Sequence, residues 1–160
     1  PAAQLDRFLM KLAMGYPDRS SQIEIMRERH HANPLDSVVP AVDIPGLLKI
    51  IGETTEVHVD DLIYNYISDL VEKTRNHPLI QLGISPRGAL ALCRTAKACA
   101  YMKGRDYVIP EDVLEIWGCV GAHRLMLSPK ARLHEQTAED ILLEIAGEVP
   151  RPDVKESAIR

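Results

Sequence analysis

Hydrophobic residues recur at helical spacing along most of the chain after residue 46. A short stripe at Leu47, Leu48 and Ile51 comes first, and four longer stripes follow it. Their members are Ile63, Tyr66, Ile67, Leu70, Val71 and Thr74; Ala89, Leu92, Cys93, Ala96 and Cys99 or Ala100; Val113, Ile116, Trp117, Val120 and Leu127; and Ile141, Leu142, Ile145 and Val149. Each stripe occupies one side of a helix. The pattern predicts a mainly α protein, a small bundle whose helices bury these faces against one another.

Polar residues mark where most of these helices begin. Asp60 and Ser85 suit N-cap positions, and Thr137 forms a capping box with the residue three positions later. Ile109 has no polar atom with which to cap the helix that follows it, so that helix start should be weaker by about 1 kcal/mol. The prolines within residues 150–152 end the last helix.

The first part of the chain has a different pattern. Phe8–Met14 is a short apolar run ended by a glycine and a proline, which predicts a buried strand. Asp18 can cap a helix over residues 19–31. Because a single strand has no partner among helices, we expect the chain to begin partway through a larger α/β module.

Composition and charge limit the classes of protein to which this chain can belong. The 160 residues suffice for one domain, or for one domain and a piece of another. The formal net charge of −4 gives no overall attraction for nucleic acid or an acidic membrane, although basic residues dominate residues 87–132. Three cysteines without metal-type spacing indicate a reducing compartment. Since no apolar run could span a bilayer and no secretion signal is evident, we expect a cytoplasmic protein.

The stretch Gly83–Gly88 combines a helix start with a cation. Ser85 suits the N-cap and Pro86 the first helical position. Arg87 then lies in the first turn, where a positive charge costs up to about 1 kcal/mol unless an anion compensates it. Free N–H groups, a guanidinium and a small Gly88 that admits close approach are typical of a phosphate site. The alternative is an exposed arginine paired with a nearby carboxylate.

The residues that other kinds of site would need, such as a metal site or a nucleophile elbow, do not have the required spacing in the sequence. Six histidines form no HExxH motif, and Cys93 and Cys99 do not face each other on a helix, so no metal site is expected. Residues 83–87 lack the last glycine of a G-x-S-x-G nucleophile elbow, which argues against a serine hydrolase. Residues 83–88 match the G-x-x-x-x-G half of a phosphate-binding loop, but Ala89 and Leu90 follow instead of Lys-Ser/Thr. This loop therefore cannot hold a triphosphate alone.

Several short strings occur together in a specific order. They are Pro1–Phe8, Gly15–Asp18, Thr74–Pro78 leading into Gly83–Ala89, Gly104–Tyr107, and Pro110–Val113. Together they resemble the C-terminal part of a MoxR-type AAA+ ATPase, from residue 1 to about residue 152. The resemblance implies a C-terminal remnant of the α/β ATPase core at residues 1–34 (strand plus linking helix). It further implies a helical lid domain at 35–152. Residues 153–160, after the prolines that end the last helix, are expected to form a disordered tail.

The resemblance also implies roles for two arginines. Arg7 matches the arginine finger, a catalytic residue that acts in trans on the γ-phosphate bound to the neighbouring subunit. Arg87 matches the sensor 2 arginine, which contacts the phosphates of the nucleotide on its own subunit, with Ser85, Pro86 and Gly88 completing the cofactor-binding segment. Both roles suit a guanidinium, which neutralises charge on a transferring phosphoryl group.

Two departures from the family pattern and one alternative accompany these roles. Ala2 stands where family members usually carry glutamate, so an acidic contact near the finger is missing. Ile109 stands where a threonine commonly caps the following helix. Considered without the resemblance, Arg7 would be expected to form an ion pair with its neighbour Asp6.

The resemblance implies an activity for the intact protein. Family members bind ATP with Mg²⁺ and hydrolyse it as a hexameric ring, and lid movement remodels a client protein in a chaperone-like way. A protein with a von Willebrand factor A domain is an expected partner; a membrane or nucleic acid is not. Walker A and Walker B segments are not found in these residues, so this chain alone should be inactive, with no cofactor bound.

Two other classes of function remain open from the sequence. One is a DNA-binding helical module, because Arg87 and Arg94 lie seven residues apart on nearly one helix face, near Lys97. The acidic total charge and the absence of neighbouring base-reading Asn or Gln residues argue against it. The other is a structural interaction domain whose arginines bind carboxylates of a partner protein.

Overall fold

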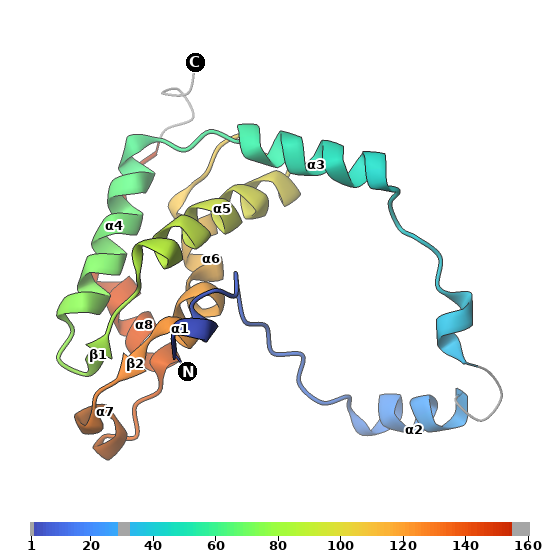
Figure 1. Ribbon diagram of the computed structural model, residues 1–160, viewed down its shortest axis with the longest axis horizontal. Helices are drawn as coiled ribbons and strands as arrows, with labels where there is room; N and C mark the ends of the chain where they lie inside the picture. The colour runs from blue at the N-terminus through green and yellow to red at the C-terminus, as the bar shows by residue number, and fades with distance from the viewer. Residues whose placement is uncertain (1, 29–32, 155–160) are drawn as a thin grey trace. The chain divides into compact units, whose positions relative to one another are not determined.

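The computed structural model describes residues 2–28 and 33–154 (Figure 1). The chain divides into two compact units. One unit comprises the described residues up to 11 together with those from 52 onward, and the other comprises the described residues of 12–51. The described residues up to 11 thus share a unit with the later helices, and the predicted domain boundary at residue 34 stays a prediction.

The larger unit is a helical bundle with a small antiparallel sheet (Figure 1). Its elements are α1 (Ala2–Leu5), α4 (Asp61–Asn76), β1 (Ile80–Leu82), α5 (Pro86–Met102), α6 (Pro110–Gly121), η2 (Ala122–Arg124), β2 (Met126–Leu127), α7 (Pro129–Leu133) and α8 (Ala138–Glu148). Strands β1 and β2 pair, with Ile80 opposite Leu127. Helix α3 (Ile44–Glu56) crosses the boundary between the two units.

The core is mostly aliphatic and contains members of the four longer predicted stripes. On α4 the buried residues are the six predicted ones: Ile63, Tyr66, Ile67, Leu70, Val71 and Thr74. Leu92 of α5, Val113 of α6 and Ile141 of α8 are also fully buried. Helices α6 and α8 are further joined where the indole Nε1 of Trp117 donates to the carbonyl of Leu142 at 2.8 Å. The mainly α fold predicted from the sequence is therefore confirmed.

The helix caps follow the sequence prediction, including at α6, where no side-chain cap was expected. Asp60 accepts from the Leu62 N–H at 2.8 Å, and Thr137 forms its capping box with the first turn of α8. Ile109 makes no side-chain cap, as predicted. Instead, Asp112 accepts from the Ile109 N–H at 3.0 Å, so a residue inside the helix secures its start.

The predicted strand at Phe8–Met14 is wrong. These residues form no strand, and the side chains of Phe8, Leu12 and Met14 are exposed. A strand needs a neighbour to receive its backbone hydrogen bonds, and the described part of the chain offers this segment no partner strand. The segment donates backbone bonds from the Phe8 N–H to the Leu5 carbonyl at 3.1 Å and from the Lys11 N–H to the Cys119 carbonyl at 2.8 Å, and neither belongs to a strand pair. The pair β1–β2 was not predicted because strands of two or three residues carry no readable alternation.

The smaller unit holds α2 (Arg19–Glu28) and η1 (Pro34–Ser37). The Asp18 carboxylate accepts from the Ser21 N–H at 2.7 Å, which confirms the predicted cap of the linking helix. Residues 29–31 of that predicted helix lie outside the described residues, as do residues 155–160 of the predicted tail. In α3 the stripe of Leu47, Leu48 and Ile51 is exposed.

Candidate functional site

The start of α5 is fixed by two adjacent residues at the end of α4. The Thr74 hydroxyl donates to the Val71 carbonyl at 2.6 Å and accepts from the Ile84 N–H at 3.0 Å. Arg75 Nε donates to the Ile84 carbonyl at 3.0 Å. At Gly83 a Cβ would lie 2.8 Å from the Cα of Arg75, so only glycine allows the loop to pass this close. The backbone leading into α5 is therefore held rigidly against α4.

Arg87 stands in the first turn of α5, directly after the predicted cap. Ser85 accepts from the Gly88 N–H at 3.3 Å, and Pro86 is the first helical residue, as predicted. The Arg87 side chain is exposed, and among the described residues no carboxylate forms an ion pair with it. The described structure therefore does not show the alternative, an ion pair between Arg87 and a nearby carboxylate. An uncompensated cation remains where the helix dipole is positive.

Asp6 connects the N-terminal segment to this helix start. Both of its carboxylate oxygens lie 3.0 Å from the Ser85 hydroxyl, which donates to them. Its Oδ1 also lies 3.2 Å from Nε of Arg124. Because Asp6 is engaged in this way, it does not pair with Arg7. The Arg7 side chain is exposed and has no ion pair within the described ranges 2–28 and 33–154.

Arg124 is the residue of this site that sequence reasoning missed. Its side chain is only 1% exposed. The guanidinium donates to the carbonyls of Leu9 at 3.2 Å, Phe8 at 2.5 Å and Asp6 at 3.4 Å, and also to the Val120 carbonyl. The one available signal was a basic residue within a mostly apolar stretch, and that pattern does not reveal a partner 118 positions away.

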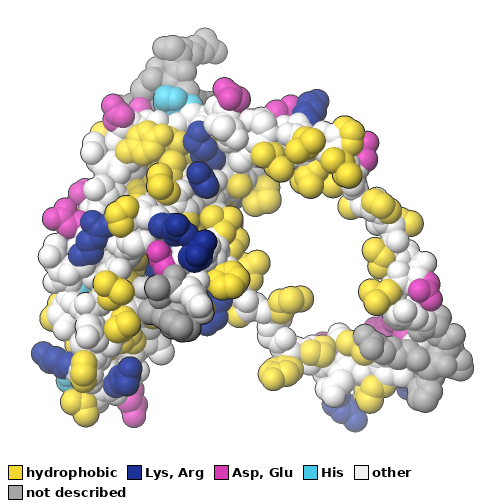
Figure 2. Space-filling view, in the orientation of Figure 1, with side chains coloured by type: hydrophobic (Ala, Val, Ile, Leu, Met, Phe, Trp, Pro, Cys, Tyr) yellow, Lys and Arg dark blue, Asp and Glu magenta, His cyan; other side chains and the backbone are white. Residues whose placement is uncertain are grey.

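The electrostatics bring Arg87 into the same neighbourhood. Burial lowers the pKa of the Arg124 guanidinium, the Asp6 carboxylate opposes that effect, and the charge of Arg87 adds to it. Arg87 is thus close enough to Arg124 to repel it. In Figure 2, Lys and Arg side chains gather around an acidic side chain over the region of α1 and the start of α5.

Gly88 has a packing role that the sequence did not indicate. A Cβ at this position would lie 2.4 Å from Cγ2 of Ile84 and 2.9 Å from Cδ of Arg124. The missing side chain therefore makes room for Arg124. Its predicted contact with phosphate stays a prediction.

A cavity of about 640 Å³ opens beside these groups. It is lined by Asp6, Arg75, Gln81, Leu82, Gly83, Ile84, Ser85, Pro86 and Arg124. Two arginines and the capped end of α5 surround it, and Asp6 is its one carboxylate. This arrangement favours an anionic group at its mouth.

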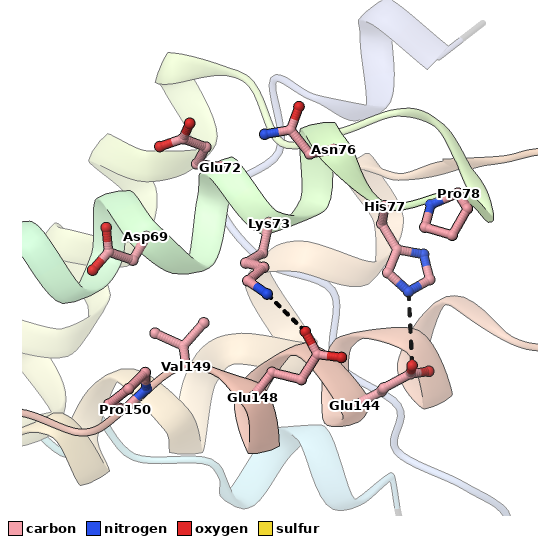
Figure 3. A pocket seen from close by; sticks show the side chains of 10 residues that line it. All are labelled: Asp69, Glu72, Lys73, Asn76, His77, Pro78, Glu144, Glu148, Val149 and Pro150. Atoms are coloured by element: carbon pink, nitrogen blue, oxygen red, sulfur yellow. Dashed lines mark hydrogen bonds and ion pairs between the residues drawn. The ribbon is translucent and has the colours of Figure 1, made fainter.

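A second cavity, of about 600 Å³, lies between α4 and α8 and has the opposite character (Figure 3). Asp69, Glu72, Glu144 and Glu148 line it. Lys73 pairs with Glu148 at 2.9 Å, which leaves the remaining acidic side chains in excess. A phosphate would be repelled here, so this cavity is not the candidate site.

The described histidine, cysteine and acidic side chains do not favour a metal site or a reactive thiol. Within the described residues no group of His, Cys, Asp and Glu is placed to hold a metal ion. Burial raises the pKa values of the Cys93 and Cys99 thiols, which makes them poor nucleophiles. Among the described helices, none combines the length and apolar character needed to cross a bilayer.

Comparison with known proteins relates this geometry to a known domain. Residues 72–145, which contain Thr74, Arg75, Arg87 and Arg124, match the AAA lid domain. Over nearly its whole length the chain is also similar to MoxR proteins. It is 32% identical to the protein MoxR of Paracoccus denitrificans (95% of the chain, 51% of the relative). It is 30% identical to the chaperone MoxR1 of Mycobacterium tuberculosis (96% and 43%).

Two further proteins are similar to this chain. The Bacillus subtilis protein YeaC, which is uncharacterised, is 41% identical over the whole chain. The crystal structure of a candidate ATPase from Cytophaga hutchinsonii superposes with a TM-score of 0.86 at 33% identity, covering 96% of this chain and 49% of that one. The chain spans about half the length of the curated relatives it matches.

Proposed function

We propose that this lid belongs to an ATP-hydrolysing AAA+ protein in which Arg87 contacts the phosphates of bound ATP as the sensor 2 residue. The observation that carries the proposal is the exposed, unpaired guanidinium of Arg87 at the capped start of α5, beside a cavity lined by Arg75 and Arg124. Helix N-termini and guanidinium groups both favour phosphate. The residues present therefore fit a nucleotide phosphate, and the lid match supports this reading.

Arg7 is the proposed arginine finger, and its position suggests a shared target. The resemblance alone assigned Arg7 to the neighbouring subunit's nucleotide and Arg87 to the chain's own. In the structure, however, the Asp6–Ser85 hydrogen bond brings the two arginine-bearing segments together within one unit. We propose that both arginines meet the same phosphate group. We therefore assign Arg87, at the sensor 2 position, to the nucleotide of the adjacent subunit together with Arg7, and not to the nucleotide of its own subunit as the resemblance implies.

The chemistry of the site follows from charge. ATP with Mg²⁺ would supply the phosphoanhydride bond that is broken. Arg7 and Arg87 stabilise the negative charge that develops on the transferred phosphoryl group, and exposure leaves both side chains free to reach it. The capped start of α5, held against α4 through Thr74 and Arg75, fixes the position from which Arg87 acts.

The proposed role of the lid is mechanical. When the nucleotide state changes, contacts at Arg87 change, and the bundle moves as a body against its neighbour. In a hexameric ring this motion would remodel a client protein, with a von Willebrand factor A domain protein as partner. The relative named as the chaperone MoxR1 supports a chaperone-like role.

The test is ATPase activity of the intact protein that carries this segment. Arg87→Ala and Arg7→Ala should each lower kcat by about 10³-fold or more, as expected for arginines that stabilise a phosphoryl transition state. Arg94→Ala is the matched control, because Arg94 is an exposed arginine of the same helix. It should leave kcat unchanged, whereas a DNA-binding helix would need Arg87 and Arg94 together. Full activity in Arg87→Ala would overturn the proposal.

A further inference from the structure

We propose that Arg124 is the positioning residue of this site, and that it holds Arg7 in the orientation in which Arg7 meets the phosphate. The inference rests on the proposed function and adds to it a residue whose guanidinium is engaged with backbone carbonyls of the protein. Its starting point is the burial of the guanidinium, whose side chain is 1% exposed. A buried cation is costly unless hydrogen bonds and a counter-charge compensate it.

The partners of Arg124 are concentrated on one short segment. Three carbonyls of this segment, those of Asp6, Phe8 and Leu9, accept from its two terminal nitrogens. Arg7 lies between the first two of these residues. Its backbone is therefore held on both sides, while its side chain stays exposed.

The same guanidinium connects this segment to the helix that bears Arg87. Nε of Arg124 lies 3.2 Å from Oδ1 of Asp6, and Asp6 in turn accepts from the Ser85 hydroxyl. Gly88 leaves the space that the Arg124 stem occupies. The buried arginine thus joins the Arg7 segment, Asp6 and the first turn of α5 into one clamp, defined here by Asp6, Ser85, Gly88 and Arg124.

A purely structural reading makes a different prediction. If Arg124 only stabilised the fold, its loss would matter no more to catalysis than an equal loss of stability elsewhere. If it positions Arg7, kcat should fall while the KM for ATP changes little, because ATP binding does not depend on the finger. Ser128 provides a control for Ser85, because each of these serines caps a helix whose first residue is a proline. Of the two, Ser85 alone donates to Asp6.

The first experiment measures the clamp itself in the 160-residue chain and does not depend on ATPase function. Limited trypsin digestion under native conditions reports access to the Arg7–Phe8 bond, and cleavage after Arg19 in the other unit is the internal reference. Ser85→Ala should speed cleavage after Arg7 about threefold and Arg124→Lys about tenfold, as hydrogen bonds to charged groups are lost. Ser128→Ala should not change it. None of these three variants alters the residues on either side of the Arg7–Phe8 bond.

The second experiment measures catalysis in the intact ATPase. Arg124→Lys and Asp6→Asn should lower kcat at least tenfold with an unchanged KM for ATP. Asp69→Asn, which removes an exposed carboxylate of α4, should have no effect.

Circular dichroism identifies any variant that fails to fold. If Arg124→Lys or Asp6→Asn fails to fold, the comparison of Ser85→Ala with Ser128→Ala tests the clamp instead. Unchanged cleavage after Arg7 overturns the clamp. Faster cleavage with normal kcat overturns the positioning role but leaves the proposed function standing, whereas normal kcat in Arg7→Ala overturns the proposed finger.

Discussion

Asp6 and Ser85 are 79 positions apart, yet the Ser85 hydroxyl lies 3.0 Å from both carboxylate oxygens of Asp6. Ser85 uses the same oxygen to cap α5, accepting from the Gly88 N–H. One hydroxyl therefore sets where the helix starts and where the N-terminal segment docks. This relationship places Arg7 and Arg87, which follow these two residues closely in the chain, on a common support.

If both arginines serve the neighbouring subunit's nucleotide, mixed rings should show complementation. Subunits with Arg87→Ala, mixed with subunits whose phosphate-binding lysine in the ATPase core is removed, should regain ATPase activity above that of either variant alone. In such a ring an intact nucleotide site meets an intact Arg87 across an interface. Steady-state ATPase assays across mixing ratios measure it. No gain at any ratio would assign Arg87 to the nucleotide of its own subunit.

The 160-residue chain by itself should show no Mg²⁺-dependent ATPase activity. Its G-x-x-x-x-G stretch is followed by Ala89 and Leu90, so the lysine and the magnesium-holding hydroxyl of a phosphate loop are not found there. Phosphate release measured with purified chain checks this. Turnover that disappears in Arg87→Ala would contradict it.

Gly88→Ala should lower the free energy of unfolding by about 1–3 kcal/mol, because the added Cβ would overlap Ile84 and Arg124. Gly118→Ala in α6 is the control, since no atom lies within 4 Å of a Cβ there. That substitution should stabilise the chain by about 0.5–1 kcal/mol. Urea unfolding of both variants measures the difference. A stabilised Gly88→Ala variant would show that the space beside Gly88 is not filled as described.

Asp112 should make stability depend on acidic pH. The carboxylate is fully buried, and Arg105 contacts it at 2.5 Å with Lys103 at 3.2 Å. Burial acts to raise its pKa, but hydrogen bonds from Arg105, the Ile109 N–H and Lys103 outweigh burial and lower the pKa below 3.8. The charged form therefore stabilises the fold above about pH 4, and this contribution is lost as pH falls through the lowered pKa.

Asp112→Asn tests this pH dependence. At pH 7 the variant should lose about 3 kcal/mol of unfolding free energy, since one partner of a buried pair is removed. The difference from the unaltered chain should stay constant above about pH 5 and shrink below about pH 4. Asp106→Asn, at an exposed neighbouring carboxylate, is the control. A difference that is the same at pH 3 and pH 7 would rule out Asp112 as the titrating group.

The features that could be predicted from the sequence depend on interactions between residues close together in the chain. The α4 stripe, the caps at Asp60, Ser85 and Thr137, and the exposed charge of Arg87 all follow from residues a few positions apart. Such signals are confined to single helices, and tertiary packing did not override them here. The strand predicted at Phe8–Met14 failed for the opposite reason, because a strand depends on partners that its own residues do not specify.

The sequence by itself determined a mainly α bundle, its core faces and an arginine at the capped start of a helix, because helical period and capping act within one turn or two. Only the tertiary structure decided that Arg124 is buried, that Gly88 makes room for it, and that Asp6 pairs with Ser85 and Arg124 rather than with Arg7. Those outcomes depend on which distant backbone carbonyls a folded chain brings to a buried guanidinium. That selection is made by desolvation and geometry, which no local pattern encodes.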